Sequence, residues 1–267
     1  MQIQKVTAPM SNTGPHHIPA LTGLRGVAVL MVFVSHAAND GPLPPAFGGG
    51  LGQLGVMLFF CLSGFLMLHL LGGRPFSRAT ATAYVAARVA RVFPLFLLVV
   101  IVSALICLIL PDFHYSFSTL DTVAAAVFFL HAPKELWSIP VEVQFYAIFL
   151  CFWWLGVLRV AGLLAVCVGF VVLAVASKLL WDNGIWIGLY GHVFCLGMLI
   201  AWWRPKLRFL GYAAALLLVL SLPAIHPKPL FSGFYTSFWL DPLRLMAVSI
   251  LVAAAADCGS GAQRILG

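Results

Sequence analysis

LTGLRGVAVLMVFVSH, residues 21–36, is an apolar stretch that contains an arginine and a histidine. The two ionisable residues, Arg25 and His36, are eleven positions apart. In an α-helix this separation is a rotation of about 1100°, roughly 20° past three full turns, and a rise of about 16 Å. Arg25 and His36 therefore share one helix face at different depths. Because ionisable groups are costly inside a bilayer and are rarely found there without a partner or a function, this pair is the first functional signal in the chain.

The composition around this stretch is that of an integral membrane protein. Apolar residues make up 62% of the 267 residues and charged residues 9%, against about 25% charged in soluble domains. Several membrane spans are expected, with no soluble domain beside them. The net charge of +7 is explained by basic cytoplasmic loops rather than by nucleic-acid binding. Residues 1–19 are polar and Pro-rich and lack the apolar core of a signal peptide, so we expect a cytoplasmic N-terminal tail before a membrane domain at 20–267.

Apolar runs of about 17 to 25 residues, the length that crosses a bilayer, predict eight full spans. They cover residues 20–38, 51–71, 92–110, 139–158, 160–180, 189–203, 209–223 and 238–256. The segment 120–131 is also apolar, but about twelve residues reach only about 18 Å as a helix. We therefore predict an all-α polytopic helical bundle with about eight full spans and one short or re-entrant helix.

Charge in the loops favours the same reading of segment 120–131. If this segment does not cross, eleven Lys and Arg residues lie on the cytoplasmic side and three on the outer side; if it crosses, the numbers are nine and five. The positive-inside rule favours the first arrangement. Both termini are then expected in the cytoplasm, and His36 is expected toward the outer half of the membrane.

A Ser-Gly pair lies inside the second apolar span, in GVMLFFCLSGF at residues 55–65. Small residues in a span allow another helix to approach closely, so packing is the expected role of Ser63 and Gly64. A nucleophilic role for Ser63 is disfavoured because no base is visible beside it in the sequence. The six cysteines are scattered without CxxC spacing, which favours buried small side chains over disulfides or metal ligands.

Two arginines precede the third predicted span in RVAR, residues 88–91. Arg88 and Arg91 share a helix face, and with Arg25, Arg74 and Arg78 they form a basic mouth on the cytoplasmic side. Membrane topology and anionic headgroups are one explanation of this mouth. The other is a phosphate-rich cytoplasmic ligand, because the forked donors of arginine suit phosphate.

WSIPVEVQFY, residues 137–146, places a carboxylate inside a span. Pro140 suits an early helical turn, and Glu142 and Tyr146 then lie one turn apart on one face. Such a carboxylate needs a partner, either in a structural pair with Arg244 or a tyrosine hydroxyl, or in a cavity shared with His36. His192 and Arg244, in later spans, are further candidates for the lining of that cavity.

These stretches together resemble the membrane acyltransferase family three, the group that contains bacterial sugar O-acetyltransferases. The matching motifs are GLRG with a histidine eleven residues after the arginine, LGVMLFFCLSGF, RVAR before a proline, WSIPVEVQFY, and FCLGM at 194–198. Their order and spacing agree with the family from residue 20 to about 201.

The resemblance implies an enzyme of the bacterial inner membrane that passes an acyl group, typically acetyl, from cytoplasmic acyl-CoA to a hydroxyl of a carbohydrate or cell-envelope glycan. Acyl-CoA is then a co-substrate, and no tightly bound cofactor or metal is implied. Position by position, the resemblance assigns catalysis to His36 and Glu142. It assigns substrate binding to Arg25, Arg88, Arg91, Ser63, Trp137 and Tyr146.

Direct transfer and a covalent acyl intermediate both remain open, and direct transfer is favoured because only His36 offers a reactive group. Two departures from the family pattern stand out. Met57 occupies a position where many members carry an aspartate, and the chain ends near the point where the usual last two spans begin. We therefore keep three alternatives: a compact member, a truncated inactive acyltransferase, and a transporter or flippase that uses the intramembrane His, Glu and Arg as a pathway.

Overall fold

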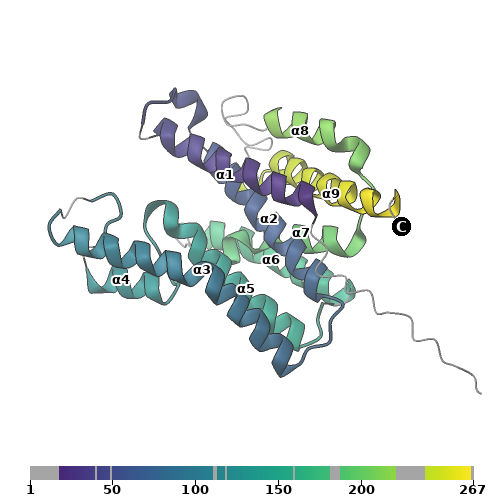
Figure 1. Cartoon of the computed structure of the whole chain (residues 1–267), viewed down its shortest axis with the longest axis horizontal. Coiled ribbons are helices and arrows are strands. Elements are labelled where there is room, and N and C mark those ends of the chain that lie inside the picture. The colour runs from purple at the N-terminus through teal and green to yellow at the C-terminus, as the bar shows by residue number, and fades with distance from the viewer. Residues whose placement is uncertain are drawn as a thin grey trace, which may run out of the picture.

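A computed structural model of the chain describes residues 18–39, 41–48, 50–110, 113–117, 119–158, 160–180, 187–220 and 238–265, and all regular elements in these ranges are helical (Figure 1). The α-helices are α1 (Pro19–Asn39), α2 (Leu51–Leu71), α3 (Arg78–Cys107), α4 (Leu120–Val127), α5 (Ser138–Trp154), α6 (Val160–Leu180), α7 (Ile187–Trp203), α8 (Gly211–Leu220) and α9 (Pro242–Ile265). The 3-10 turns are η1 (Pro45–Phe47), η2 (Lys134–Trp137), η3 (Arg208–Leu210) and η4 (Phe238–Leu240). The predicted all-helical fold is confirmed.

Four helical segments of the described chain are long and apolar enough to cross a membrane: 19–39, 51–71, 78–107 and 134–154. Shorter apolar helices cover 161–176, 187–203 and 211–220. The count of eight spans therefore stays a prediction. Residues 221–223 of one predicted span, and residues 1–17 of the predicted tail, lie outside the described residues. The eight-residue helix α4 reaches only about 12 Å, so it is too short to cross, as expected for segment 120–131.

Helix α3 begins earlier than the predicted third span. A capping box starts it, in which Thr80 N donates to Ser77 Oγ at 3.2 Å and Ser77 N donates to Thr80 Oγ1 at 2.9 Å. Such reciprocal bonds satisfy backbone donors that the first helical turn leaves open. The helix then continues through Pro94 to Cys107. Arg88 and Arg91 consequently lie inside a 30-residue helix, so the helical face that they were expected to share is confirmed.

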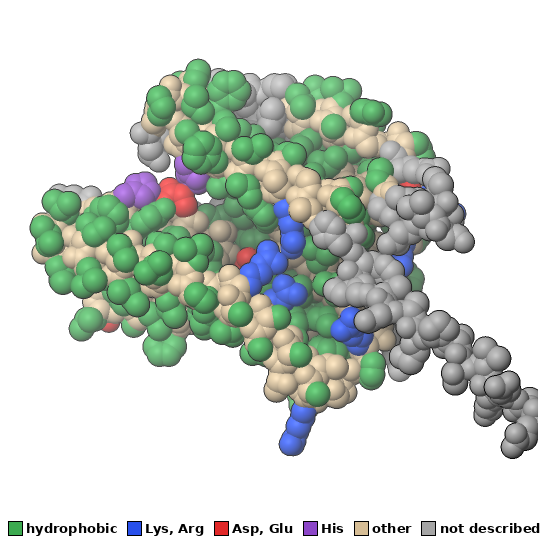
Figure 2. Space-filling view, in the orientation of Figure 1, with side chains coloured by type: hydrophobic (Ala, Val, Ile, Leu, Met, Phe, Trp, Pro, Cys, Tyr) green, Lys and Arg blue, Asp and Glu red, His purple; other side chains and the backbone are tan. Residues whose placement is uncertain are grey.

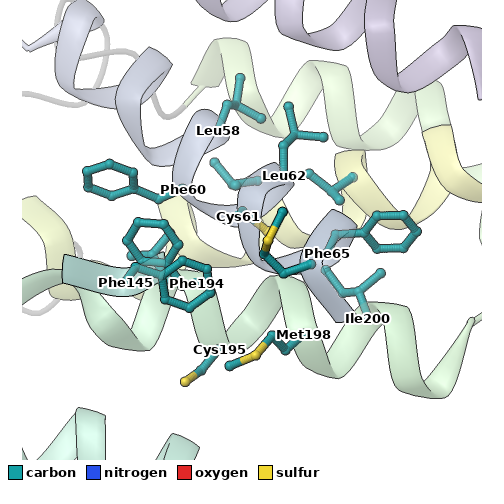
Figure 3. Close-up of a cluster of buried hydrophobic side chains, with 14 of the residues drawn as sticks. Leu58, Phe60, Cys61, Leu62, Phe65, Phe145, Phe194, Cys195, Met198 and Ile200 are labelled. Atoms are coloured by element: carbon teal, nitrogen blue, oxygen red, sulfur yellow. The ribbon is translucent and has the colours of Figure 1, made fainter. Parts of the chain in front are cut away.

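Helix α2 lies at the centre of the bundle and contacts α1, α5, α7 and α9. Two glycines bring α2 and α7 together, because a Cβ on Gly64 would clash with the Phe194 carbonyl oxygen and a Cβ on Gly197 with the Cys61 carbonyl oxygen. This close approach confirms the packing role expected of Gly64 in the Ser-Gly pair. Around it, the Phe194 ring stacks between Phe60 and Phe145, with centroids 4.4 Å and 4.1 Å apart (Figure 3).

A smaller core joins α3, α4 and the start of α5 on one side of α2, while α1, α8 and α9 lie on the other side (Figure 1). Hydrophobic side chains also cover much of the outer surface (Figure 2), and Phe33, Leu95 and Val172 are among the large exposed ones. Apolar surface of this extent is rare on soluble monomers and is expected where helices face lipid. All six cysteines are free, and Cys151 and Cys258 are exposed rather than buried as expected.

Candidate functional site

A cavity of about 220 Å³ lies between α1, the start of α2 and the turn η2. We call it the His36 pocket, because His36 projects from the last turn of α1 onto its wall. Trp137, which the sequence assigned to substrate binding, lines the same cavity. The other polar side chains on its wall are Ser35, Asn39, Gln53, Lys134, Glu135 and Ser138. A reactant in this pocket would therefore meet an imidazole, a carboxylate and several hydrogen-bonding groups.

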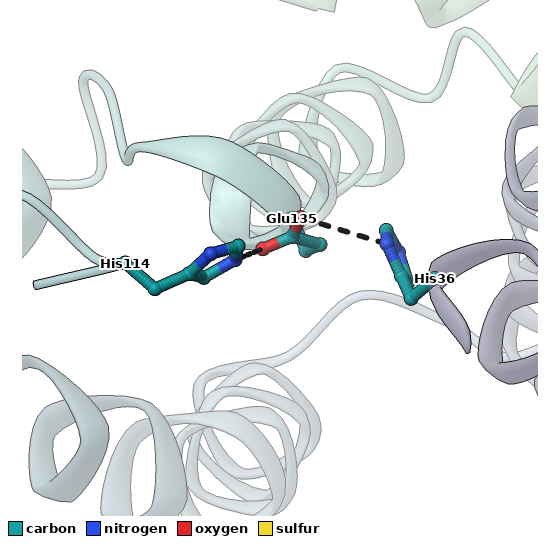
Figure 4. A network of polar contacts seen from close by, with 3 residues as sticks. All are labelled: His36, His114 and Glu135. Atoms are coloured by element: carbon teal, nitrogen blue, oxygen red, sulfur yellow. Dashed lines mark hydrogen bonds and ion pairs between the residues drawn. The ribbon is translucent and has the colours of Figure 1, made fainter. Parts of the chain in front are cut away.

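The carboxylate beside His36 is Glu135, which sequence reasoning missed. His36 Nδ1 lies 3.5 Å from Glu135 Oε1, and His114 Nε2 lies 2.9 Å from Glu135 Oε2 (Figure 4). Glu135 therefore lies between two imidazoles that come from α1 and from the loop 113–117. The three side chains are 39%, 23% and 43% exposed in the order His36, Glu135, His114. All three side chains are therefore accessible to water or to a reactant.

The backbone next to Glu135 turns sharply to present this side chain. Lys134 has a φ of 51°, in the left-handed region that non-glycine residues rarely adopt. Tyr115, on the same loop as His114, lies beside the carboxylate; burial first, and then the negative charge of Glu135, raise the pKa of its hydroxyl. Among the described residues, no group of three His, Cys, Asp or Glu side chains has the arrangement of a metal site.

A second polar cluster surrounds Glu142. Glu142 Oε1 accepts hydrogen bonds from Ser63 Oγ at 3.0 Å and from the Tyr146 hydroxyl one turn further along α5. The tyrosine hydroxyl anticipated as a possible partner is therefore confirmed. The sequence showed no base beside Ser63, and the fold places a carboxylate there. The two hydrogen bonds to this one oxygen hold the carboxylate in place between α2 and α5.

The three predicted donor-binding arginines gather near this carboxylate, and we call them the arginine cluster. The Arg88 guanidinium lies 5.3 Å from the Tyr146 ring centroid and 5.6 Å from the Tyr84 ring centroid. Arg25 lies close enough to Arg88, Arg91 and Glu142 to interact with each electrostatically. Figure 2 shows Lys and Arg side chains gathered on this face. Arg88 Nε is buried and has no hydrogen-bond partner in the described part of the chain.

The sequence left open a cavity that His36 shares with Glu142, and the His36 pocket is not such a cavity. Glu142 is absent from the lining of the His36 pocket, and its position seven residues after Glu135 corresponds to about 10 Å along a helix. The face of α1 that carries Arg25 and His36 is long enough to meet two different parts of the 134–154 segment. Its Arg25 end meets Glu142, and its His36 end meets Glu135.

Two later candidates have structural contacts instead. Arg244 Nη1 lies 3.3 Å from Asp241 Oδ2, and its guanidinium is 4.0 Å from the Phe238 ring centroid. His192 Nε2 lies 2.8 Å from the Trp239 carbonyl oxygen. Neither side chain lines the His36 pocket, so the suggestion that they line it is wrong.

The fold and the two clusters define an all-helical protein with membrane-length helices and a histidine-carboxylate pocket. The family model for the acyltransferase domain of membrane acyltransferase family three matches residues 18–264, so the chain belongs to this family and is an integral membrane protein. Protein 2 in picA locus, from Rhizobium radiobacter, is 36% identical over 102 residues, which are 37% of this chain and 51% of that protein. The chain thus matches about half the length of this curated relative. No solved structure matches the chain.

Proposed function

We propose that this protein is a membrane O-acyltransferase that moves an acyl group, typically acetyl, from cytoplasmic acyl-CoA to a hydroxyl of a carbohydrate or cell-envelope glycan. The observation that carries the proposal is the place of His36 on the wall of a cavity, 3.5 Å from a carboxylate, in a member of an acyltransferase family. An imidazole in such a setting is suited to proton transfer at neutral pH.

The contact with Glu135 indicates which nitrogen of His36 is the base. A carboxylate only accepts hydrogen bonds, so in the proposed reaction Nδ1 carries the proton on the side of Glu135 and Nε2 is left as an acceptor. In the proposed reaction, Nε2 takes the proton of the acceptor hydroxyl while the hydroxyl oxygen attacks the thioester carbonyl carbon. The carbon-sulfur bond then breaks, and the leaving CoA sulfur takes the proton back from Nε2. Direct transfer of this kind needs no other nucleophile.

The arginine cluster is suited to hold the donor. CoA carries its phosphates at the end opposite to the thioester, and arginine binds phosphate through forked, charge-assisted hydrogen bonds. Arg25 and His36 are about 16 Å apart along α1, so a donor bound by the cluster has to extend its thioester arm along this helix to reach the His36 pocket. The unpartnered Arg88 Nε supports this assignment, because a buried donor without a partner is costly.

The lining of the His36 pocket supports a carbohydrate as the acceptor. Trp137 lies in an aromatic group with Tyr190 and Phe60, at centroid distances of 4.8 Å and 6.1 Å, and offers a flat apolar surface next to the polar wall. Sugar rings present both apolar faces and hydroxyls, so they need both kinds of contact. We further propose that the protein resides in a bacterial inner membrane with its N-terminus in the cytoplasm and the His36 pocket toward the outer side.

The decisive experiment measures CoA release from purified protein in nanodiscs that receive radiolabelled acetyl-CoA, with and without an envelope-glycan fraction. We expect glycan labelling that His36→Ala abolishes and that His131→Ala, a matched control outside the pocket, retains. A folded wild-type protein that releases no CoA with any glycan fraction would contradict the proposal. Uptake of a solute into proteoliposomes without CoA release would support the transporter alternative.

A further inference from the structure

A different cavity, of about 490 Å³, opens where α2 and α7 both end. We call it the Arg204 pocket. Its lining includes Leu68 and His69 in the last turn of α2 and Gly72 just after it. It also includes Trp202 near the end of α7, Arg204 just after that helix, and Leu158 after α5. Arg204 contributes a permanent positive charge, and no carboxylate is among the lining residues. We propose that this pocket binds the phosphate headgroup of an anionic phospholipid.

The side chain of Arg204 is held across the mouth of the pocket. Its Nη2 lies 3.3 Å from His69 Nδ1, and its Nε donates to the Ala201 carbonyl oxygen at 3.4 Å. The His69 ring is itself stacked on Phe65, with centroids 5.4 Å apart. A guanidinium has five N–H donors, and these contacts use two of them. Arginine with donors to spare in a fixed orientation suits a phosphate group.

The backbone of Arg204 indicates that the side chain has a role. Arg204 follows the last residue of α7, has a φ of 47°, and donates its N–H to the Ile200 carbonyl oxygen at 2.8 Å. Helices often end with a residue in this left-handed conformation, and it is usually glycine because a Cβ is unfavourable there. An arginine at this position keeps a strained backbone, which is typical of residues retained for function.

Exposed aromatic rings place the Arg204 pocket at the depth of lipid headgroups. Trp202 and Trp203 are 48% and 77% exposed, and Tyr212 is 94% exposed. Exposed Trp and Tyr side chains of membrane proteins concentrate at the interface between hydrocarbon and water. A phosphate at this level belongs to a lipid more readily than to a soluble ligand. In the orientation proposed above, the pocket faces the cytoplasmic leaflet, where anionic lipids are concentrated.

The test compares nanodiscs of phosphatidylglycerol with nanodiscs of phosphatidylcholine. We expect the thermal midpoint of the wild-type protein to be about 2–4 °C higher in the anionic lipid, because a ligand that binds only the folded state stabilises it. Native mass spectrometry should detect retained phosphatidylglycerol. Both signals should be lost in Arg204→Gln and kept in Lys206→Gln, a nearby cation outside the pocket lining.

The variant Arg204→Gly distinguishes the effect of lipid binding on stability from the effect of backbone strain on stability. Glycine relieves the backbone strain, so we expect this variant to melt above Arg204→Gln in phosphatidylcholine and yet to gain nothing from phosphatidylglycerol. A phosphatidylglycerol effect that survives in Arg204→Gly would overturn the proposal. Equal stabilisation by inorganic phosphate or CoA in phosphatidylcholine discs would overturn the assignment to a lipid. None of these measurements requires acyl transfer, so their failure is distinct from failure of the proposed function.

Discussion

The His36 pocket and the arginine cluster lie toward opposite ends of α1 and are built in different ways. At the pocket, His36 and His114 contact Glu135 at 3.5 Å and 2.9 Å with all three side chains partly exposed. At the arginine cluster, Glu142 accepts two hydrogen bonds, and Arg88 lies against the rings of Tyr84 and Tyr146. One region presents accessible imidazole and carboxylate groups, and the other presents a cluster of guanidinium groups.

This difference indicates that the two ends of one face of α1 have different functions, with catalysis at the His36 end and donor binding at the Arg25 end. A reacting group must be accessible to its substrate, whereas a phosphate-binding group benefits from fixed geometry and partial burial, which strengthen its electrostatic interactions. Changes at the His36 pocket should therefore lower kcat, and changes at the arginine cluster should raise the KM for the donor. The predictions below test this separation, and each relies on the acyl-transfer assay described above unless it states otherwise.

Among the variants that leave His36 in place, the largest effect is expected from Glu135→Gln. Glutamine can present its amide nitrogen to His36 Nδ1, which would favour the wrong tautomer and misplace the ring, and small misplacements in an active site can cost about 100-fold. We expect a loss of kcat of this size with little change in the KM for acetyl-CoA, and a partial recovery in Glu135→Asp. Equal activity of Glu135→Gln and wild type would remove Glu135 from the mechanism.

The next largest effect is expected from Arg88→Lys, and it should appear in the KM for acetyl-CoA rather than in kcat. Lysine keeps the charge but loses the buried Nε donor and the planar contact with two tyrosine rings. A hydrogen bond to a charged group contributes about 1.5–3 kcal/mol, so the KM for acetyl-CoA should rise about tenfold or more. Lys206→Arg, a charge-conserving change at an exposed cation outside the basic mouth, is the matched control. A fall in kcat alone would contradict the proposed separation.

His114 should have a weaker influence than Glu135, because it acts only through that carboxylate. Exposed ion pairs contribute about 0.2–1 kcal/mol, so His114→Ala should reduce kcat by at most about fivefold. His114→Gln can still donate a hydrogen bond to Glu135 and should restore part of the loss. Initial-rate measurements at saturating donor distinguish the two variants. A loss as large as that of Glu135→Gln would indicate that His114 contacts the reactants directly.

The smallest effect on turnover is expected from Ser63→Ala. This change removes one hydrogen bond to Glu142 and leaves the Tyr146 bond in place, so the free energy of unfolding should fall by about 1 kcal/mol. The thermal midpoint in nanodiscs measures this change, and kcat should stay within about twofold of the wild-type value. A complete loss of transfer in folded Ser63→Ala would revive the nucleophile reading of this serine.

The sequence predicted the arginine cluster and the carboxylate of Glu142 better than it predicted the His36 pocket. Glu142 and Tyr146 are four residues apart on one helix, and Arg88 and Arg91 are three apart, so helical periodicity alone places each pair on a common face. Glu135 lies in the turn η2 and His114 in an irregular loop, where no period relates them to His36. Their meeting depends on how α3, α4 and α5 fold back beside α1.

By itself, the sequence determined the membrane character, the helical fold and the shared face of Arg25 and His36, because composition and local periodicity act within single helices. It also indicated the family, through the resemblance of its motifs in order and spacing. Only the tertiary structure decided that Glu135 rather than Glu142 faces His36, and that Arg204 meets His69. Such contacts join residues that are far apart in the chain. Their geometry follows from helix packing around α2, to which residues as distant in the sequence as Gly64 and Gly197 contribute.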